Sequence, residues 1–285
     1  MTAAAGPVTC ANCGRAFDGR FCPDCGQETG DPRRPIREVL DEFLGDALNL
    51  DGRMLATARR LVIAPGALAA DYVGGRRVRH APPFKLYVFL SALFFAVLAF
   101  SDGGPLRFAA NRVGEEVSIA SAFGIRIGAT GLSQATEGSI EARISLAGQE
   151  VDRLNDVVVA TLSYAHFLLL PVVAFLLRLL WRSRWYVEHL VFATYFGAFT
   201  LLTGIVVIAG YALAGNPAPG GPAARLAIVL WESVVVVMLY RALRDMYGSG
   251  RLRTIARLFV LIVGYFVSAG AVVIGIALAT IQLLY

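Results

Sequence analysis

Four cysteines near the N-terminus have the spacing of a metal site. They lie in the stretch CANCGRAFDGRFCPDCGQ, residues 10–27, as two Cys-x2-Cys pairs, each followed by a glycine. Four thiolates are the ligand set of a tetrahedral structural Zn²⁺ and leave no open position for catalysis. A glycine after each pair lets the backbone turn beneath the sulfurs. We therefore expect a structural zinc ribbon over residues 1–30, with these ligands: Cys10, Cys13, Cys22 and Cys25.

Other chemistry for the same cysteines is less well supported. The eight residues between the pairs cannot bury a core, so metal binding would supply most of the folding free energy of this segment. Two disulfides would require an oxidising compartment, and a redox dithiol would require a βαβ context that the sequence does not show. Iron in a rubredoxin-like site remains the main alternative to zinc.

The cysteine segment lacks the charge of a nucleic-acid reader. Its basic residues are Arg15 and Arg20, and they are offset by Asp18, Asp24 and Glu28. A phosphate-binding surface requires clustered Lys or Arg. We therefore expect no nucleic acid among its partners, and a protein partner at the cytoplasmic face instead.

The rest of the chain has the composition of a membrane protein. Of 285 residues, 56% are hydrophobic and only 16% are charged, and the charges lie in a few short segments. This pattern predicts an all-α polytopic membrane protein. The first ten residues, MTAAAGPVTC, have neither the basic nor the apolar region of a cleavable signal peptide, so we expect internal helices to direct insertion.

About five segments are long and apolar enough to be transmembrane helices, because a bilayer core requires about 20 apolar residues. Pro171 is expected to kink the second span without ending it. Within the transmembrane domain, 81–285, the predicted spans are 84–100, 157–177, 187–213, 223–240 and 258–284.

The arginines beside these segments predict the topology. Basic clusters precede the first span, separate the second from the third, and separate the fourth from the fifth. With five spans all three clusters fall on one side, which the positive-inside rule makes the cytoplasm. We expect a multi-pass membrane protein with a cytoplasmic N-terminus and an extracytoplasmic C-terminus.

Residues 31–80 link the cysteine segment to the first span. Apolar periodicity predicts two amphipathic helices, one near 36–48 and a more basic one over 52–73. They would lie on the inner leaflet, pack against the ends of the spans, or do both. Four basic residues then mark the membrane surface: Arg76, Arg77, Arg79 and Lys85.

The extracytoplasmic loop, 101–156, is too long for a turn. Within it, 117–131 alternates apolar and small polar residues around glycine, as a β-hairpin does, and 144–158 has a helical pattern. We expect a small extracytoplasmic α/β cap.

Several ionisable residues fall inside or beside the apolar segments, where charge is costly and suggests function. Glu232 lies near the middle of the fourth span, and His166 and Tyr195 are candidate hydrogen-bond donors to it. The alternative role for Glu232 is a hydrogen bond that only fixes helix packing. Glu188 and His189 begin the third span, where an ion pair of Glu188 with Arg184 or Arg182 is the simpler interpretation.

The sequence contains no nucleophile-base pattern, phosphate loop or HExxH motif, which argues against an enzyme. Gly264 and Ser268, four residues apart in the fifth span, favour close helix packing and contacts between copies of the chain.

Several blocks together resemble the bacterial membrane family named domain of unknown function 3667. These blocks are the cysteine segment, LDGRMLATARRLVIAPGALAADYVGGRRVRHAPPFKLYVFLS, WYVEHLVFATYFGAF and YRALRDMYGSGRLRT. The resemblance implies an inner-membrane protein with an N-terminal zinc ribbon and no established activity. Related sequences often carry another His after YVEHLVF, where this chain reads ATYFGAF.

The sequence leaves three functional hypotheses. The first is a non-enzymatic scaffold or regulator that binds a protein through its zinc ribbon and juxtamembrane helices. The second is a small transporter or proton-coupled carrier that uses Glu232. The third is a lipid-modifying enzyme that uses Glu188 and His189.

Overall fold

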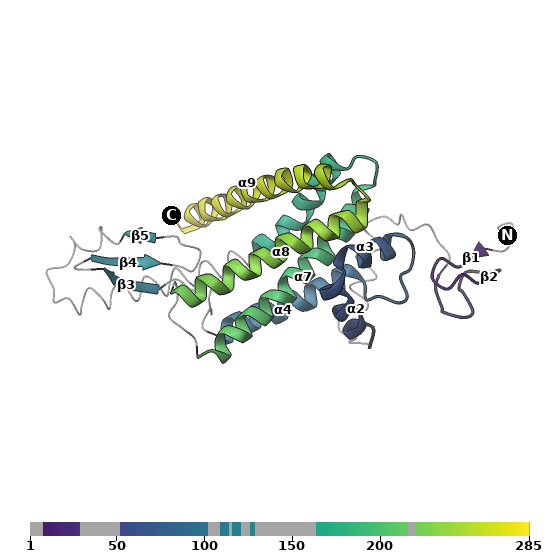
Figure 1. Cartoon of the computed structure of the whole chain (residues 1–285), viewed down its shortest axis with the longest axis horizontal. Coiled ribbons are helices and arrows are strands. Elements are labelled where there is room, and N and C mark those ends of the chain that lie inside the picture. The colour runs from purple at the N-terminus through teal and green to yellow at the C-terminus, as the bar shows by residue number, and fades with distance from the viewer. Residues whose placement is uncertain are drawn as a thin grey trace. The chain divides into compact units, whose positions relative to one another are not determined.

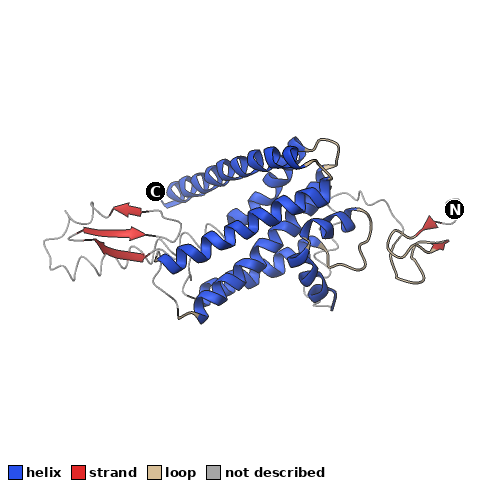
Figure 2. Ribbon diagram, in the orientation of Figure 1, coloured by secondary structure: helices blue, strands red, loops and turns tan. Residues whose placement is uncertain are grey.

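The structure is a computed structural model of the whole chain. It describes residues 8–28, 52–101, 109–113, 116–120, 126–128, 164–215 and 221–284. The helices predicted near 36–48 and 144–158 lie outside the described residues. Helix dominates the part of the chain that the structure describes, as Figures 1 and 2 show.

Seven described helical segments follow the predicted apolar and amphipathic stretches. Each long helix begins or ends at proline, glycine or a charged cluster, which are the expected stop signals. Their bounds are α2, Gly52–Ile63; α3, Pro65–Val73; α4, Pro83–Phe100; an apolar helix, Tyr164–Leu180; α7, Tyr186–Leu213; α8, Pro222–Tyr247; and α9, Arg251–Leu284.

Four described helices are long and apolar enough to cross a membrane: α4, α7, α8 and the Arg251–Val272 part of α9. The second predicted span, 157–177, is described only from residue 164, within the shorter apolar helix Tyr164–Leu180. These helices confirm a mainly helical protein with candidate membrane spans, and the count of five remains a prediction. Both α8 and α9 extend beyond the predicted spans into the arginine-rich segment between them, which leaves only residues 248–250 as the connection.

The second amphipathic stretch forms two helices instead of one. Pro65 has no N–H to donate, so α2 ends at Ile63 and Pro65 becomes the first residue of α3. The last turn of α2 is closed by the Ala64 N–H, which donates to Arg60 O at 2.9 Å.

The chain divides into two compact units. The first unit comprises Met1–Leu90, Leu170–Thr200 and Val237–Ser268. The second comprises Ser91–Leu169, Leu201–Val236 and Ala269–Tyr285. Each long helix therefore contributes one part to each unit.

Two features organise the helical part of the first unit. The first is a backbone contact between α3 and α8: a Cβ on Gly66 would lie 2.3 Å from Ala242 O, so only glycine fits at this position. The second is a chain of buried hydrogen bonds. The Tyr195 hydroxyl donates to Ala81 O at 2.7 Å, and the Ala81 N–H donates to Thr57 Oγ1 at 2.9 Å. These bonds connect α7, the residues before α4, and α2.

The amphipathic helices thus pack at least partly on protein. One face of α2 buries Met54, Thr57 and Leu61, and α3 buries Leu68 and Ala69. This packing agrees with the interpretation that these helices cover the ends of the spans. Their contact with a lipid leaflet remains a prediction.

In the second unit, α7 and α8 pack through Tyr211, Ala224 and Ile228. The Trp231 indole N–H donates to Thr203 Oγ1 at 3.0 Å, which joins the same two helices. This unit also contains an antiparallel sheet in the order β3-β4-β5. Its strands are β3, Ala109–Val113; β4, Glu116–Ala120; and β5, Arg126–Gly128.

The sheet confirms that the long loop contains strands. The predicted hairpin corresponds to β4 and β5, in which Ile119 pairs with Ile127. The first strand, β3, lies outside the predicted alternation and pairs Ala109 with Ala120.

Candidate metal centre

Two equivalent turns build the cysteine segment. In the first, Cys10 N–H donates to Arg15 O and Gly14 N–H donates to Cys10 O; in the second, Cys22 and Gly26 make the same bonds. Gly14 and Gly26 have φ values of 81° and 71°, which side chains rarely adopt. Strands β1, Val8–Thr9, and β2, Ala16–Phe17, pair beside the first turn. The glycine after each pair therefore serves the turn that the sequence predicted.

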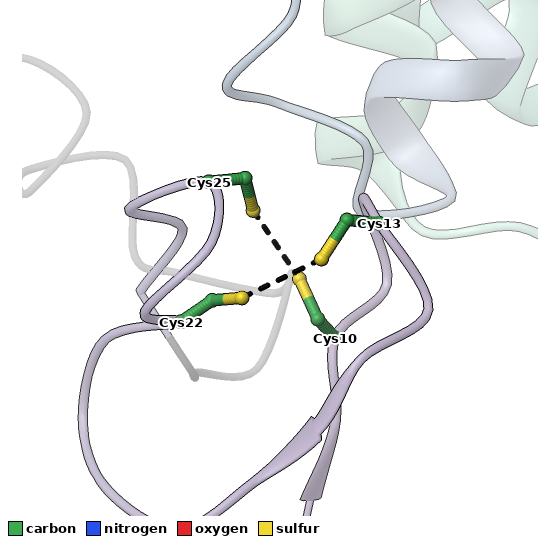
Figure 3. Close-up of side chains that lie close together, drawn as sticks. All are labelled: Cys10, Cys13, Cys22 and Cys25. Carbon is green, nitrogen blue, oxygen red and sulfur yellow. Dashed lines mark hydrogen bonds between the residues drawn. The ribbon is translucent and has the colours of Figure 1, made fainter.

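The four sulfurs point toward one another at the centre of the two turns (Figure 3). Cys10 Sγ lies 3.6 Å from Cys25 Sγ, and Cys13 Sγ lies 3.5 Å from Cys22 Sγ. All four sulfurs lie within 4.8 Å of one another. All four cysteines are free thiols. The structure thus brings together every residue of the predicted ligand set.

The geometry fits a metal ion. A tetrahedral ion with metal–sulfur bonds of about 2.3 Å has sulfur–sulfur edges of about 3.8 Å, close to the two shortest separations here. Cys10 and Cys22 are buried, whereas Cys13 is exposed. The four cysteines can hold a metal ion without a water ligand, and such a site stabilises structure instead of activating substrate.

Hydrogen bonds act on the second cysteine of each pair, but the net shift in pKa has opposite directions at Cys25 and Cys13. Hydrogen bonds from the Asn12 side chain and from the Gln27 backbone lower the pKa of Cys25 to about 6. At Cys13 the Arg15 backbone acts in the same direction, but desolvation and the neighbouring thiols raise the pKa of Cys13 to about 12. Four adjacent thiolates repel one another, and a divalent cation would remove that repulsion.

The surface of the cysteine segment is electrostatically paired. Arg15 binds Asp24, and Arg20 Nε donates to Glu28 Oε1 at 2.8 Å. Phe17 packs against Cys10 and Cys22, but Phe21 is 56% exposed. The Arg20 guanidinium lies 5.4 Å from the centre of the Phe21 ring, and the exposed part of the ring is available for an apolar contact.

Gln27 joins the cysteine segment to the loop between α3 and α4, residues 74–82, called the basic loop below. Its side-chain amide donates to Gly75 O at 2.5 Å, and its Oε1 accepts the Arg77 N–H at 3.3 Å. One amide side chain thus satisfies a donor and an acceptor of the loop backbone.

The four basic residues predicted at the membrane surface have different environments. Arg76 binds Asp71, and the Arg77 guanidinium lies 5.5 Å from the centre of the Tyr72 ring. Arg79 is exposed. Lys85, however, is only 6% exposed, because the protein covers its side chain at the start of α4.

Glu188 and His189 have separate structural roles. Glu188 Oε2 accepts from Arg184 Nη1 at 3.0 Å, which confirms the predicted ion pair. His189 is fully buried, and its Nε2 lies 3.2 Å from Trp181 O, so this nitrogen must donate. Its Nδ1 then accepts from the Tyr247 hydroxyl at 2.7 Å. Because both ring nitrogens are engaged, His189 is poorly suited to acid–base catalysis.

The proposed donors to Glu232 form other hydrogen bonds. His166 Nε2 lies 3.0 Å from Ser91 Oγ, and Tyr195 donates to Ala81 O. Glu232 is exposed on α8 and has no ion pair or hydrogen bond with the described residues. The structure therefore does not bring together the predicted polar residues of the spans.

The close packing predicted for Gly264 occurs within the chain. A Cβ at Gly264 would lie 3.2 Å from Leu176 Cδ1, and Ser268 donates to Gly264 O at 2.7 Å. Contacts between copies of the chain remain a prediction.

Three functional residues were not identified from the sequence. The Asn12 side chain hydrogen-bonds to the Cys25 sulfur, and the Gln27 side chain binds the basic loop. Asp71 binds two arginines. For Asp71 a signal exists, since it is the one acidic residue among seven basic residues in 52–90. Asn12 lies between the cysteines of the first pair and Gln27 follows the glycine after the second pair, and neither position carries a comparable signal.

Together, the fold and the site define a helical protein whose described residues include four candidate membrane spans and a four-cysteine segment suited to a metal ion. The family model described as "Protein of unknown function (DUF3667)" matches residues 51–95, which supports the resemblance to that family. The matched residues include α2, α3, the basic loop and most of α4. No curated protein and no solved structure matches the chain.

Proposed function

We propose that this chain is a non-enzymatic scaffold or regulator of the bacterial inner membrane. In this proposal the cysteine segment is a zinc ribbon that binds a protein partner in the cytoplasm, together with the juxtamembrane helices. Five spans anchor it, with the N-terminus inside and the C-terminus outside. The family description carries no activity, so the argument depends on the chain's own residues.

The closed four-sulfur site is the observation that carries the proposal. Four cysteine ligands leave no position for substrate, so the ion would serve to hold a surface in shape. On that surface the charges are paired internally, as Arg15–Asp24 and Arg20–Glu28. The exposed Phe21 ring is then the natural contact for a protein partner, because buried aromatic residues dominate the energetics of such interfaces.

Proximity labelling from the N-terminus of the full-length protein tests this proposal. We expect Phe21→Ala to lose a set of labelled proteins while keeping a full complement of bound metal. Val8→Ala is the control, because it also shortens an exposed apolar side chain of the ribbon. It should keep the same labelled proteins. If Phe21→Ala and Cys22→Ser leave the labelled proteins unchanged, the ribbon does not recruit a partner.

A second candidate function depends on Glu232. A carboxylate without a described partner, on an exposed face of an apolar helix, is costly in a bilayer unless it binds a proton or another ligand. A proton-coupled carrier would use that group directly. In this case Glu232→Gln would abolish pH-driven substrate uptake into proteoliposomes, and unchanged uptake would exclude the role.

The proposed topology has its own test. A reporter fused after Tyr285 should signal from outside the cytoplasm. A cytoplasmic signal would instead require an even number of spans.

A further inference from the structure

The basic loop between α3 and α4 belongs to an unusually cationic segment. Residues 52–90 contain seven basic side chains and a single acid, Asp71. Topology explains an excess of positive charge beside a span, but it does not explain a particular arrangement. The seven basic residues are Arg53, Arg59, Arg60, Arg76, Arg77, Arg79 and Lys85.

Asp71 holds two of these arginines in a defined clamp. Arg60, from α2, binds Asp71 Oδ2, and Arg76, from the loop, binds Asp71 Oδ1. The Asp71 side chain is only 14% exposed, whereas those of Arg60 and Arg76 are 42% and 50% exposed. Each guanidinium has five N–H donors, and only its Nη2 nitrogen binds Asp71. Further N–H donors therefore remain available on the exposed side of each arginine.

A buried histidine lies beside the clamp. His80 is only 5% exposed, its Nε2 is 3.9 Å from Asp71 Oδ2, and that nitrogen has no hydrogen-bond partner among the described residues. Burial and the charge of Arg60 lower the pKa of His80. A neutral imidazole leaves the clamp with one more positive charge than negative charge, from Arg60, Arg76 and Asp71.

We propose that Arg60 and Arg76, with the exposed Arg79, bind the phosphate group of an anionic phospholipid. A phosphate matches the paired N–H donors of a guanidinium, and Asp71 pre-organises two guanidiniums for it. The loop immediately precedes α4, a candidate membrane span. The proposal therefore places its side chains at the depth of lipid headgroups. The site is independent of the protein partner proposed for the zinc ribbon.

Binding of short-chain lipids to the purified full-length protein tests the site. The probes are dihexanoyl phosphatidylglycerol, the corresponding phosphatidylcholine, and inorganic phosphate. We expect preferential binding of phosphatidylglycerol over the zwitterionic lipid and over inorganic phosphate. If inorganic phosphate binds equally well through the same arginines, the site recognises phosphate but its assignment to a phospholipid is overturned.

Three variants separate this site from general attraction to positive charge. Arg76→Gln should weaken phosphatidylglycerol binding by at least about fivefold, the effect of one charge near a lipid headgroup. The control Arg59→Gln removes the same charge from an exposed position without an Asp71 contact, and should change binding by less than about twofold. Asp71→Asn removes the negative charge that competes for both guanidiniums and keeps a carbonyl oxygen that can still hold one of them. We therefore expect the electrostatic gain to exceed the loss of positioning, so this variant should bind more tightly.

If Arg76→Gln folds poorly, Asp71→Asn still tests the proposal, because tighter binding cannot result from loss of folded protein. Arg76→Lys, which keeps the charge but loses the fork of donors, provides a second check and should also bind more weakly. Equal losses for Arg59→Gln and Arg76→Gln would overturn the proposal. Weaker binding by Asp71→Asn, in protein that keeps its thermal stability, would also overturn it.

Discussion

The cysteine segment and the helical part of the first unit depend on different kinds of interaction. In the former, four side chains at fixed spacing converge on one point, and the segment has only a small apolar cluster around Phe17. In the latter, α2, α3, α7 and α8 meet through a glycine contact and a chain of buried hydrogen bonds. The folding of the cysteine segment should depend on one bound metal ion. The helical part should lose only part of its stability when any single contact is removed.

Metal removal should produce the largest difference between the two regions. Structural zinc contributes about 10–16 kcal/mol of apparent binding free energy in small zinc-finger peptides, and little else holds this segment. We expect a chelator, or Cys22→Ser, to abolish hydrogen-exchange protection of residues 8–28 while α7 and α8 stay protected. Ala16→Ser, a serine placed away from the sulfurs, is the control. Retained protection of residues 8–28 without metal would contradict the comparison.

Gly66→Ala should have the next largest effect. The new Cβ would overlap the backbone of Ala242 on α8, so we expect a loss of about 2–3 kcal/mol in unfolding free energy. Gly210→Ala provides the matched control, because a Cβ there meets nothing within 4 Å and alanine favours a helix. Denaturant titration in detergent measures both variants. Equal stability of the two would show that α3 does not pack on α8.

A smaller loss is expected for Tyr195→Phe. This change removes the hydroxyl that donates to Ala81 O and leaves a buried carbonyl without that bond, which costs about 1–2 kcal/mol. Tyr186 donates to Pro171 O from an exposed position, so Tyr186→Phe should cost less than about 0.5 kcal/mol. The same titration distinguishes them, and a larger loss for Tyr186→Phe would refute the ranking.

The smallest effect should come from Glu188→Gln. Its ion pair with Arg184 joins the segment before α7 to the first turn of α7 at a partly exposed position, where such pairs contribute about 0–1 kcal/mol. The loss should shrink further in high salt. A loss above about 3 kcal/mol would mean that Glu188 has a role beyond this pair.

The features that the sequence predicted correctly are those that depend on local residue patterns. Cysteine spacing identified all four members of the sulfur cluster, because the Cys-x2-Cys turn is local and each glycine serves the turn beside it. Hydropathy located the long helices, since a membrane span needs only length and apolar composition. Pro65 also carried a local signal, and the division between α2 and α3 follows from its missing N–H.

Contacts between distant segments were not predictable in this way. Nothing near Gly66 in the sequence indicates that Ala242 lies against it, and Gln27 contacts residues about fifty positions later. Likewise, the hydropathy of 84–100 suggested that Lys85 would extend to the interface, whereas its burial depends on which elements cover the start of α4. These features require the arrangement of the helices, which residue spacing does not encode.

The hydrogen bond from Gln27 to Gly75 joins residues 48 positions apart, so the two partners are synthesised at different times. At about 5–20 residues per second, the loop emerges roughly 2–10 seconds after Gln27 is made. Both cysteine pairs precede Gln27, so the ribbon can take its metal before its docking loop exists. For those seconds its thiols must either bind a metal or remain open to oxidation. Supply of metal to the nascent chain would therefore decide whether Gly75 meets a folded ribbon.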